Sequence, residues 1–105
     1  MGRAAVLNEL KKILLGRFPG RIQRVILYGS RATASARPHS DYDILVVLGE
    51  NFDWRLEDEI LASCYEVDLK CDIVTDVKVI SRSDLDTLKG KQPYVLAALA
   101  SGIRA

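Results

Sequence analysis

Two aspartates, Asp41 and Asp43, stand two residues apart where a buried strand is expected to begin. Residues two apart in a strand point to the same face, so these carboxylates would repel each other. One of them is then expected to take up a proton unless a cation lies between them. Mg²⁺ prefers oxygen ligands and is commonly held by one or two carboxylates together with substrate phosphates. Alone, the pair is a weak signal, because two solvated acids at a loop–strand junction give the same pattern.

A second polar segment, Gly29-Ser30-Arg31, follows the preceding strand. If Ser30 begins a helix, free backbone N–H groups lie at the positive end of that helix, which is a natural phosphate site. Glycine lets a phosphate approach the backbone, Ser30 can donate its hydroxyl, and Arg31 adds a cation. A plain glycine turn with a serine N-cap is the alternative interpretation.

These segments need flanking elements to bring them together. The hydrophobic pattern predicts a small mixed β-sheet with helices packed on it, of the α/β (α+β) class. Strands are expected over residues 21–28, 43–48 and 65–80, the last one long or broken. Helices are expected over residues 6–14, 30–36 and 81–89, in a segment that Trp54 opens over the core, and from Pro93 to a stop at Gly102. Residues 37–40 are expected to form a loop in which His39 is solvated.

Length and composition bound the class of protein. With 105 residues, the chain is expected to form one domain over residues 1–105. A formal net charge of +1 argues against nucleic acid or an anionic membrane as the main partner. No apolar run reaches membrane-spanning length. Two cysteines are too few for a disulfide framework, so Cys64 and Cys71 are expected to be reduced thiols in a cytoplasmic protein.

The two polar segments combine into one composite motif, "GSRATASARPHSDYD". It resembles that of the nucleotidyltransferases of the DNA polymerase β superfamily, and most of all the small stand-alone minimal nucleotidyltransferases. Their consensus is close to G-S-R-A-x-G-x-A-x-x-x-S-D-x-D, and Ala34 departs from it by standing where the family usually has glycine. The matching residues are Gly29, Ser30, Arg31, Ala32, Ala36, Ser40, Asp41 and Asp43.

The family also has a third carboxylate on a neighbouring strand. Asp68, Asp72 and Asp76 are spaced by four and would share one face of an unbroken strand. The segment "TDVKVIS" (residues 75–81) resembles the superfamily's hydrophobic-D-hydrophobic-basic-hydrophobic strand, with Asp76 as its acid and Lys78 as its basic residue. The resemblance therefore favours Asp76, with Asp72 as second choice. A charged edge strand that guards against pairing is the alternative.

The resemblance implies a polymerase β-like nucleotidyltransferase fold and transfer of a nucleotide, AMP from ATP, to a hydroxyl acceptor. Two Mg²⁺ ions would be held by Asp41, Asp43 and Asp76, which are the implied catalytic residues. The residues implied in binding the phosphates of ATP or another nucleoside triphosphate are Gly29, Ser30, Arg31 and Ser40.

Minimal nucleotidyltransferases act as antitoxins of all-helical HEPN-type proteins, so the resemblance implies such a partner and a place in a toxin–antitoxin pair. A module of the same fold that is catalytically weak or inactive, and that neutralises a partner by binding alone, is the competing hypothesis. A phosphoryl-acceptor or Ca²⁺-loop domain fits less well, because it leaves Gly29 and Ser30 without a role.

Overall fold

The computed structural model describes residues 2–29, 41–87 and 91–104. Its elements in chain order are helix α1 (Arg3–Arg17), strands β1 (Ile22–Tyr28) and β2 (Tyr42–Leu48), helix α2 (Trp54–Cys71), strand β3 (Thr75–Ser81), the 3-10 helix η2 (Ser83–Asp86), helix α3 (Pro93–Ser101) and strand β4 (Ile103–Arg104). The helix expected over residues 30–36 and the loop expected over residues 37–40, with His39, lie outside the described residues.

The four strands form one mixed sheet in the order β3-β2-β1-β4. Strand β2 runs antiparallel to β1 and parallel to β3, and β4 pairs antiparallel with the other edge of β1. Strand β2 is a nearly continuous apolar run, as expected for a strand covered on both faces. The prediction of a small mixed sheet with helices packed on it is confirmed; the two-residue strand β4 was not predicted.

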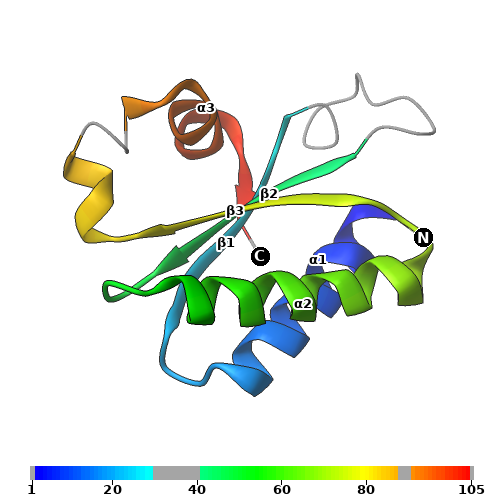
Figure 1. Ribbon diagram of the computed structural model, residues 1–105. Coiled ribbons are helices and arrows are strands. Elements are labelled where there is room, and N and C mark those ends of the chain that lie inside the picture. Colours follow the sequence, from blue (N-terminus) through cyan, green and yellow to red (C-terminus); the bar gives the residue numbers. More distant parts are fainter. Residues whose placement is uncertain (1, 30–40, 88–90, 105) are drawn as a thin grey trace.

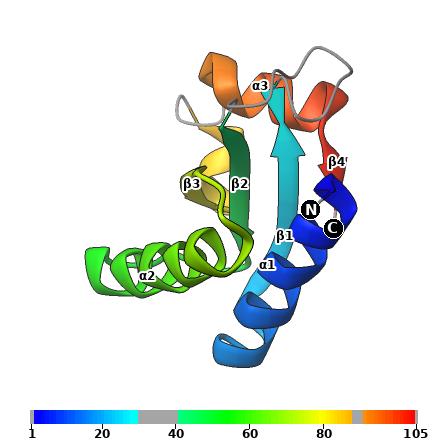
Figure 2. The ribbon, with the colours of Figure 1, turned by 90° about the vertical axis from the view of Figure 1, so that its right-hand side faces the viewer.

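Helices cover both faces of the sheet. Helices α1 and α2 lie side by side on one face, and α3 lies on the other (Figures 1 and 2). The larger apolar cluster joins α1 and α2 to the sheet, and its fully buried members include Leu10, Leu14, Ile44 and Ile60. The smaller cluster lies under α3 and is built from Ile26, Tyr28, Leu45, Val47, Ile80, Val95 and Ala98. Alternate residues of each central strand therefore serve two different cores.

Helix α2 is longer than expected, and the strand predicted over residues 65–80 is wrong in its first half. Ile60, Cys64 and Val67 recur at helical spacing and are all buried against the sheet. The helix ends where Asp72 adopts a left-handed conformation with φ of 54° and donates its N–H to the carbonyl of Asp68. Strand β3 begins only at Thr75.

Asp68 joins the end of α2 to the start of β3. Its carboxylate accepts a hydrogen bond from the backbone N–H of Thr75 at 3.2 Å and another from the Thr75 hydroxyl at 2.6 Å. Asp68, Asp72 and Asp76 therefore do not share a strand face: the first is on a helix, the second ends that helix, and only the third is on β3.

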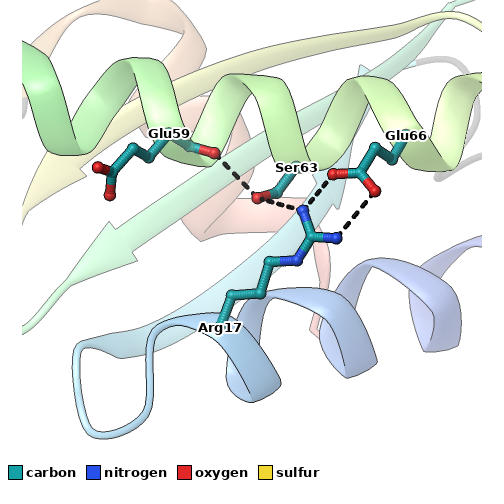
Figure 3. Close-up of polar contacts among 4 residues, drawn as sticks. All are labelled: Arg17, Glu59, Ser63 and Glu66. Atoms are coloured by element: carbon teal, nitrogen blue, oxygen red, sulfur yellow. Dashed lines mark hydrogen bonds and ion pairs between the residues drawn. The ribbon is translucent and has the colours of Figure 1, made fainter.

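A polar clamp joins the two helices on the outer face (Figure 3). The Arg17 guanidinium donates to both carboxylate oxygens of Glu66 and to the Ser63 hydroxyl. That hydroxyl donates in turn to the backbone carbonyl of Glu59 at 2.9 Å. A bidentate arginine–carboxylate pair has a defined geometry, so the clamp fixes how α1 lies against α2.

Other predictions have mixed outcomes. The last helix begins at Pro93 and is capped by Gly102, as expected, and Cys64 and Cys71 are free thiols.

Trp54 opens α2, but its placement over the core is wrong, because its side chain is 69% exposed beside Arg55. Of the helix predicted over residues 81–89, the described part holds only η2. In the described part of the chain, no helix is long and apolar enough to cross a membrane.

Asp68→Ala is expected to lower the free energy of unfolding by about 1–3 kcal/mol, because two donors of Thr75 lose a charged acceptor. Urea unfolding followed by circular dichroism measures the change. Asp58→Ala, an exposed aspartate of the same helix, is the matched control and should change stability by less than about 0.5 kcal/mol. Equal stabilities of the two variants would contradict the structural role of Asp68.

Candidate active site

Three polar side chains form a row across the sheet at the end of β1. Tyr28 of β1 lies opposite Asp43 of β2, and Asp43 lies opposite Asp76 of β3. Partners in register share a face, and this face is the one that α3 covers, because Leu45, Val47 and Ile80 follow at alternate positions and pack under α3. The structure therefore makes Asp76 the direct neighbour of Asp43.

Gly29 lies so close to Asp43 that a β-carbon at residue 29 would require the Asp43 carboxylate to shift. Its φ of 72° is in the left-handed region, and a β-carbon built on it would lie 2.3 Å from Oδ2 of Asp43. Glycine alone meets both conditions without strain. The backbone of the glycine-containing segment and the carboxylate of Asp43 are thus held against each other, although they are fourteen residues apart in the chain.

Negative charge gathers along this row. The pKa of Asp43 is raised, first by partial burial and then by the charges of Asp76 and Asp41, while the Lys78 ammonium opposes the rise. Burial, together with the same Asp43 and Asp76 charges, raises the pKa of Tyr28 to about 12, so its phenol stays protonated at neutral pH. The site is one that favours a cation.

Asp76 and Asp41 are more open to solvent than Asp43. Asp41 is exposed and directly precedes β2, whose first backbone N–H, on Tyr42, donates to the carbonyl of Val74. Asp76 is also exposed, and its Oδ1 lies 3.1 Å from Nζ of Lys78. Tyr42 itself is buried in the core under α1 and α2, on the face opposite Asp43.

The carboxylates near Gly29 suit a divalent cation that also binds water and substrate, although they do not form a complete set of protein ligands. Among residues 2–29, 41–87 and 91–104, no three acidic, histidine or cysteine side chains are gathered closely enough to form a ready-made metal group. Mg²⁺ needs no such group, because it is commonly held by one or two carboxylates and completes its shell with waters and substrate phosphates. Asp41 and Asp43 could supply such carboxylates, and the backbone of Gly29 lies beside Asp43.

The predicted site residues have different outcomes. The structure brings Gly29, Asp43 and Asp76 together, with Asp41 beside them. Ser30, Arg31 and Ser40 lie outside the described residues. Asp72 ends α2, which removes the strand argument for it as third carboxylate.

Tyr28, and the contact of Lys78 with Asp76, were missed by reasoning from sequence. Tyr28 joins the site through its antiparallel register with Asp43, for which the sequence carries no direct signal. The contact of Lys78 with Asp76 follows instead from strand alternation, because residues two apart on β3 share a face.

A separate hollow in the described part of the chain lies away from this row. It is a groove of about 530 Å³ between α1 and α2, and ion pairs of Arg17 with Glu66 and of Lys70 with Glu9 cross it. Helices α1 and α2, which line the groove, lie on one face of the sheet (Figure 1), whereas Asp43 and Asp76 belong to the face that α3 covers. We assign it to the seam between two helices, because it lacks the paired carboxylates of the row.

Comparison with known proteins gives one family. The family model described as "Polymerase beta, Nucleotidyltransferase" matches residues 8–98. A protein of Methanocaldococcus jannaschii with the provisional name protein adenylyltransferase is 31% identical over 81 residues, which are 77% of this chain and 76% of that protein.

Similar solved structures show the same fold. A toxin–antitoxin crystal structure with AMP-PNP matches with a TM-score of 0.62 and 21% identity, over 92% of this chain and 69% of that one. A second match has a TM-score of 0.58 and 19% identity, over 96% of this chain and 69% of that one; it belongs to a complex of a tri-AMPylated HEPN toxin of Shewanella oneidensis with its MNT antitoxin. At such identities, the likeness establishes the fold alone.

Gly29→Ala is expected to lower the free energy of unfolding by about 1–2 kcal/mol, because an alanine is strained at positive φ and its β-carbon displaces the Asp43 carboxylate. Gly16→Ala is the control, since Gly16 lies in α1 with nothing within 4 Å of an added β-carbon. It should raise stability by up to about 1 kcal/mol. Urea unfolding of both variants checks the opposite signs; a stabilised Gly29→Ala would contradict the close approach.

Asp43→Asn is expected to raise the melting temperature by roughly 2–4 °C at pH 7, because it removes a partly buried charge that Asp76 and Asp41 repel. A carboxyl whose folded pKa is raised lowers stability as the pH rises from its unfolded pKa to its folded pKa, so the gain should grow over that interval and be complete above the folded pKa. It should vanish near pH 3, below the unfolded value of about 3.9.

Thermal unfolding at both pH values measures this effect, with the exposed Asp58→Asn as control. A less stable Asp43→Asn at pH 7 would show that Asp43 is held by favourable contacts instead.

Proposed function

Because the chain belongs to the polymerase beta nucleotidyltransferase family, as its match over residues 8–98 shows, we propose that it transfers AMP from ATP to a hydroxyl group of a HEPN-type helical protein. The general activity follows from the family: the chain is a nucleotidyltransferase. The nucleotide, the acceptor and the metal are the proposed parts. The close approach of Gly29 to Asp43 is the observation that supports the phosphate and metal sites most directly.

Phosphates of the nucleotide would lie against Gly29, because the absence of a side chain there exposes backbone beside Asp43. Ser30, Arg31 and Ser40 would add a hydroxyl, a cation and a further hydroxyl to the phosphate contacts. Asp41 and Asp43 would hold Mg²⁺, with Asp76 sharing a second ion. Bound there, Mg²⁺ would neutralise charge on the phosphates and stabilise the attacking and departing oxygens.

The carboxylates of the chain would also act on the acceptor. Asp76 is exposed at the start of an edge strand, where an acceptor hydroxyl can reach it from outside. It would take the proton of that hydroxyl as the oxygen attacks the α-phosphorus. The bond from the α-phosphorus to the bridging oxygen of the β-phosphate breaks, and pyrophosphate leaves. The row of carboxylates thus orients the acceptor beside the phosphates that Gly29 admits.

The proposed acceptor rests on similar proteins. The relative from Methanocaldococcus jannaschii has a name that assigns it transfer of an adenylyl group to protein. Two similar structures are toxin–antitoxin complexes, one with AMP-PNP and one with an AMPylated HEPN toxin. A HEPN-type protein is therefore the acceptor that we propose here, with a place for this chain as antitoxin.

Incubation of the chain with a HEPN-type protein, Mg²⁺ and ATP labelled at the α-phosphate is expected to label the partner. ATP labelled at the γ-phosphate should leave it unlabelled, because pyrophosphate is the leaving group. Asp41→Ala and Asp43→Ala are each expected to reduce transfer on the order of a thousandfold, the scale of a lost group that stabilises the transition state. Asp58→Ala, exposed on α2, should keep full activity.

Partner neutralisation in the same samples separates catalysis from binding. A partner that both Asp→Ala variants neutralise as well as the wild type would contradict the enzyme and support a binding module of the same fold. Competition with unlabelled GTP, CTP and UTP tests the choice of base: ATP alone should suppress labelling efficiently.

A further inference from the structure

Lys78 is placed where its charge acts on the row of carboxylates. In the parallel pairing of β2 with β3, Lys78 lies opposite Leu45, one step along the same face from the pair Asp43 and Asp76. Leu45 packs under α3, so this is the face of the proposed site. The Lys78 side chain is 44% exposed. A long, partly exposed ammonium at this position can turn along the strand without disturbing the core.

Two observations connect Lys78 to the site. Its Nζ lies 3.1 Å from Oδ1 of Asp76, so it occupies one oxygen of the carboxylate that we assign to the metal and the acceptor. Its position on β3 is paired with Leu45, two residues after Asp43 on β2, so its charge faces the same side of the sheet as both carboxylates. The ammonium therefore partly neutralises the same carboxylates that a divalent cation would neutralise.

The contact between Lys78 and Asp76 is easily exchanged. Both side chains are about half exposed, and ion pairs of this kind contribute little to stability because water solvates both partners well. A divalent cation carries twice the charge and prefers carboxylate oxygen, so it competes well for Asp76. A released lysine ammonium is a common point-charge partner of phosphate.

We propose that Lys78 is a built-in counter-ion of Asp76, which a divalent cation displaces and which then binds a phosphate oxygen of the incoming nucleotide. This inference rests on the proposed function, since it assigns Lys78 to the same nucleotide and metal site. Lys78, the basic residue of the strand pattern around Asp76, thus gains a role in binding substrate. Lys78 would pair with Asp76 before the metal binds and with phosphate afterwards. Removal of its charge should therefore strengthen metal binding and weaken nucleotide binding.

The test compares Lys78→Gln with the wild type in two binding measurements. Without nucleotide, Mn²⁺ binding is followed by the electron paramagnetic resonance signal of free Mn²⁺. Lys78→Gln is expected to bind Mn²⁺ about two- to fivefold more tightly, because the metal no longer displaces an exposed ion pair. In saturating Mg²⁺, AMP-PNP binding is measured by calorimetry. There, Lys78→Gln is expected to bind about tenfold more weakly, because a charged phosphate contact is lost.

Two control variants separate charge at this site from general effects. Lys78→Arg keeps the positive charge and should stay near the wild type in both measurements. Lys70→Gln breaks another exposed lysine–carboxylate pair, with Glu9 across the α1–α2 seam, and should change neither constant. Lys78→Gln binding like the wild type in both measurements, or shifting both constants in one direction, would overturn the proposal.

Asp43→Asn separates this inference from the proposed function. If Asp43→Asn binds Mn²⁺ as well as the wild type does, the proposed metal site fails and the role of Lys78 fails with it. If Asp43→Asn loses Mn²⁺ while Lys78→Gln leaves both constants unchanged, the metal site stands and only the role of Lys78 is overturned.

Discussion

The close approach of Gly29 to Asp43 is the constraint on which the site depends. A β-carbon at residue 29 would lie 2.3 Å from a carboxylate oxygen, and the φ of 72° there suits glycine alone. This contact makes the end of β1 and the start of β2 a single polar corner, in which exposed backbone adjoins a partly buried acid. The proposed function places phosphates beside this backbone and a cation at this acid, which together suit a nucleotide with its metal.

The two faces of the sheet carry different features. One face carries the larger core under α1 and α2, where the Arg17 clamp fixes the two helices to each other. The other face carries a smaller core under α3, which includes Tyr28, and Asp43 and Asp76 continue the row from Tyr28 across the sheet. Charges that repel one another are thereby kept apart from the packing that stabilises the fold. Partial burial of Asp43 beside the charges of Asp76 and Asp41 lowers the stability of the fold. Such a cost is common at functional sites.

Local pattern predicted much of this fold, and long-range pairing accounts for what it missed. The apolar run of β2 and the proline and glycine that bound α3 are strong local signals. The second half of α2 was mistaken for strand because charges alternate with apolar residues through Glu66 to Cys71, yet Leu69 in that run is exposed on the helix. The motif resemblance pointed to Asp76. Its pairing with Asp43, however, depends on the parallel register of β2 and β3, two strands that the whole of α2 separates in the chain. A local sequence pattern cannot specify that register.

A crystal structure of the chain with Mg²⁺ and AMP-PNP tests the central claim most directly. The account predicts that the phosphates lie beside the backbone of Gly29 and that Mg²⁺ binds between the carboxylates of Asp41 and Asp43. AMP-PNP seated instead in the groove between α1 and α2, beside Lys12 and Arg17, with no cation at Asp43, would contradict it.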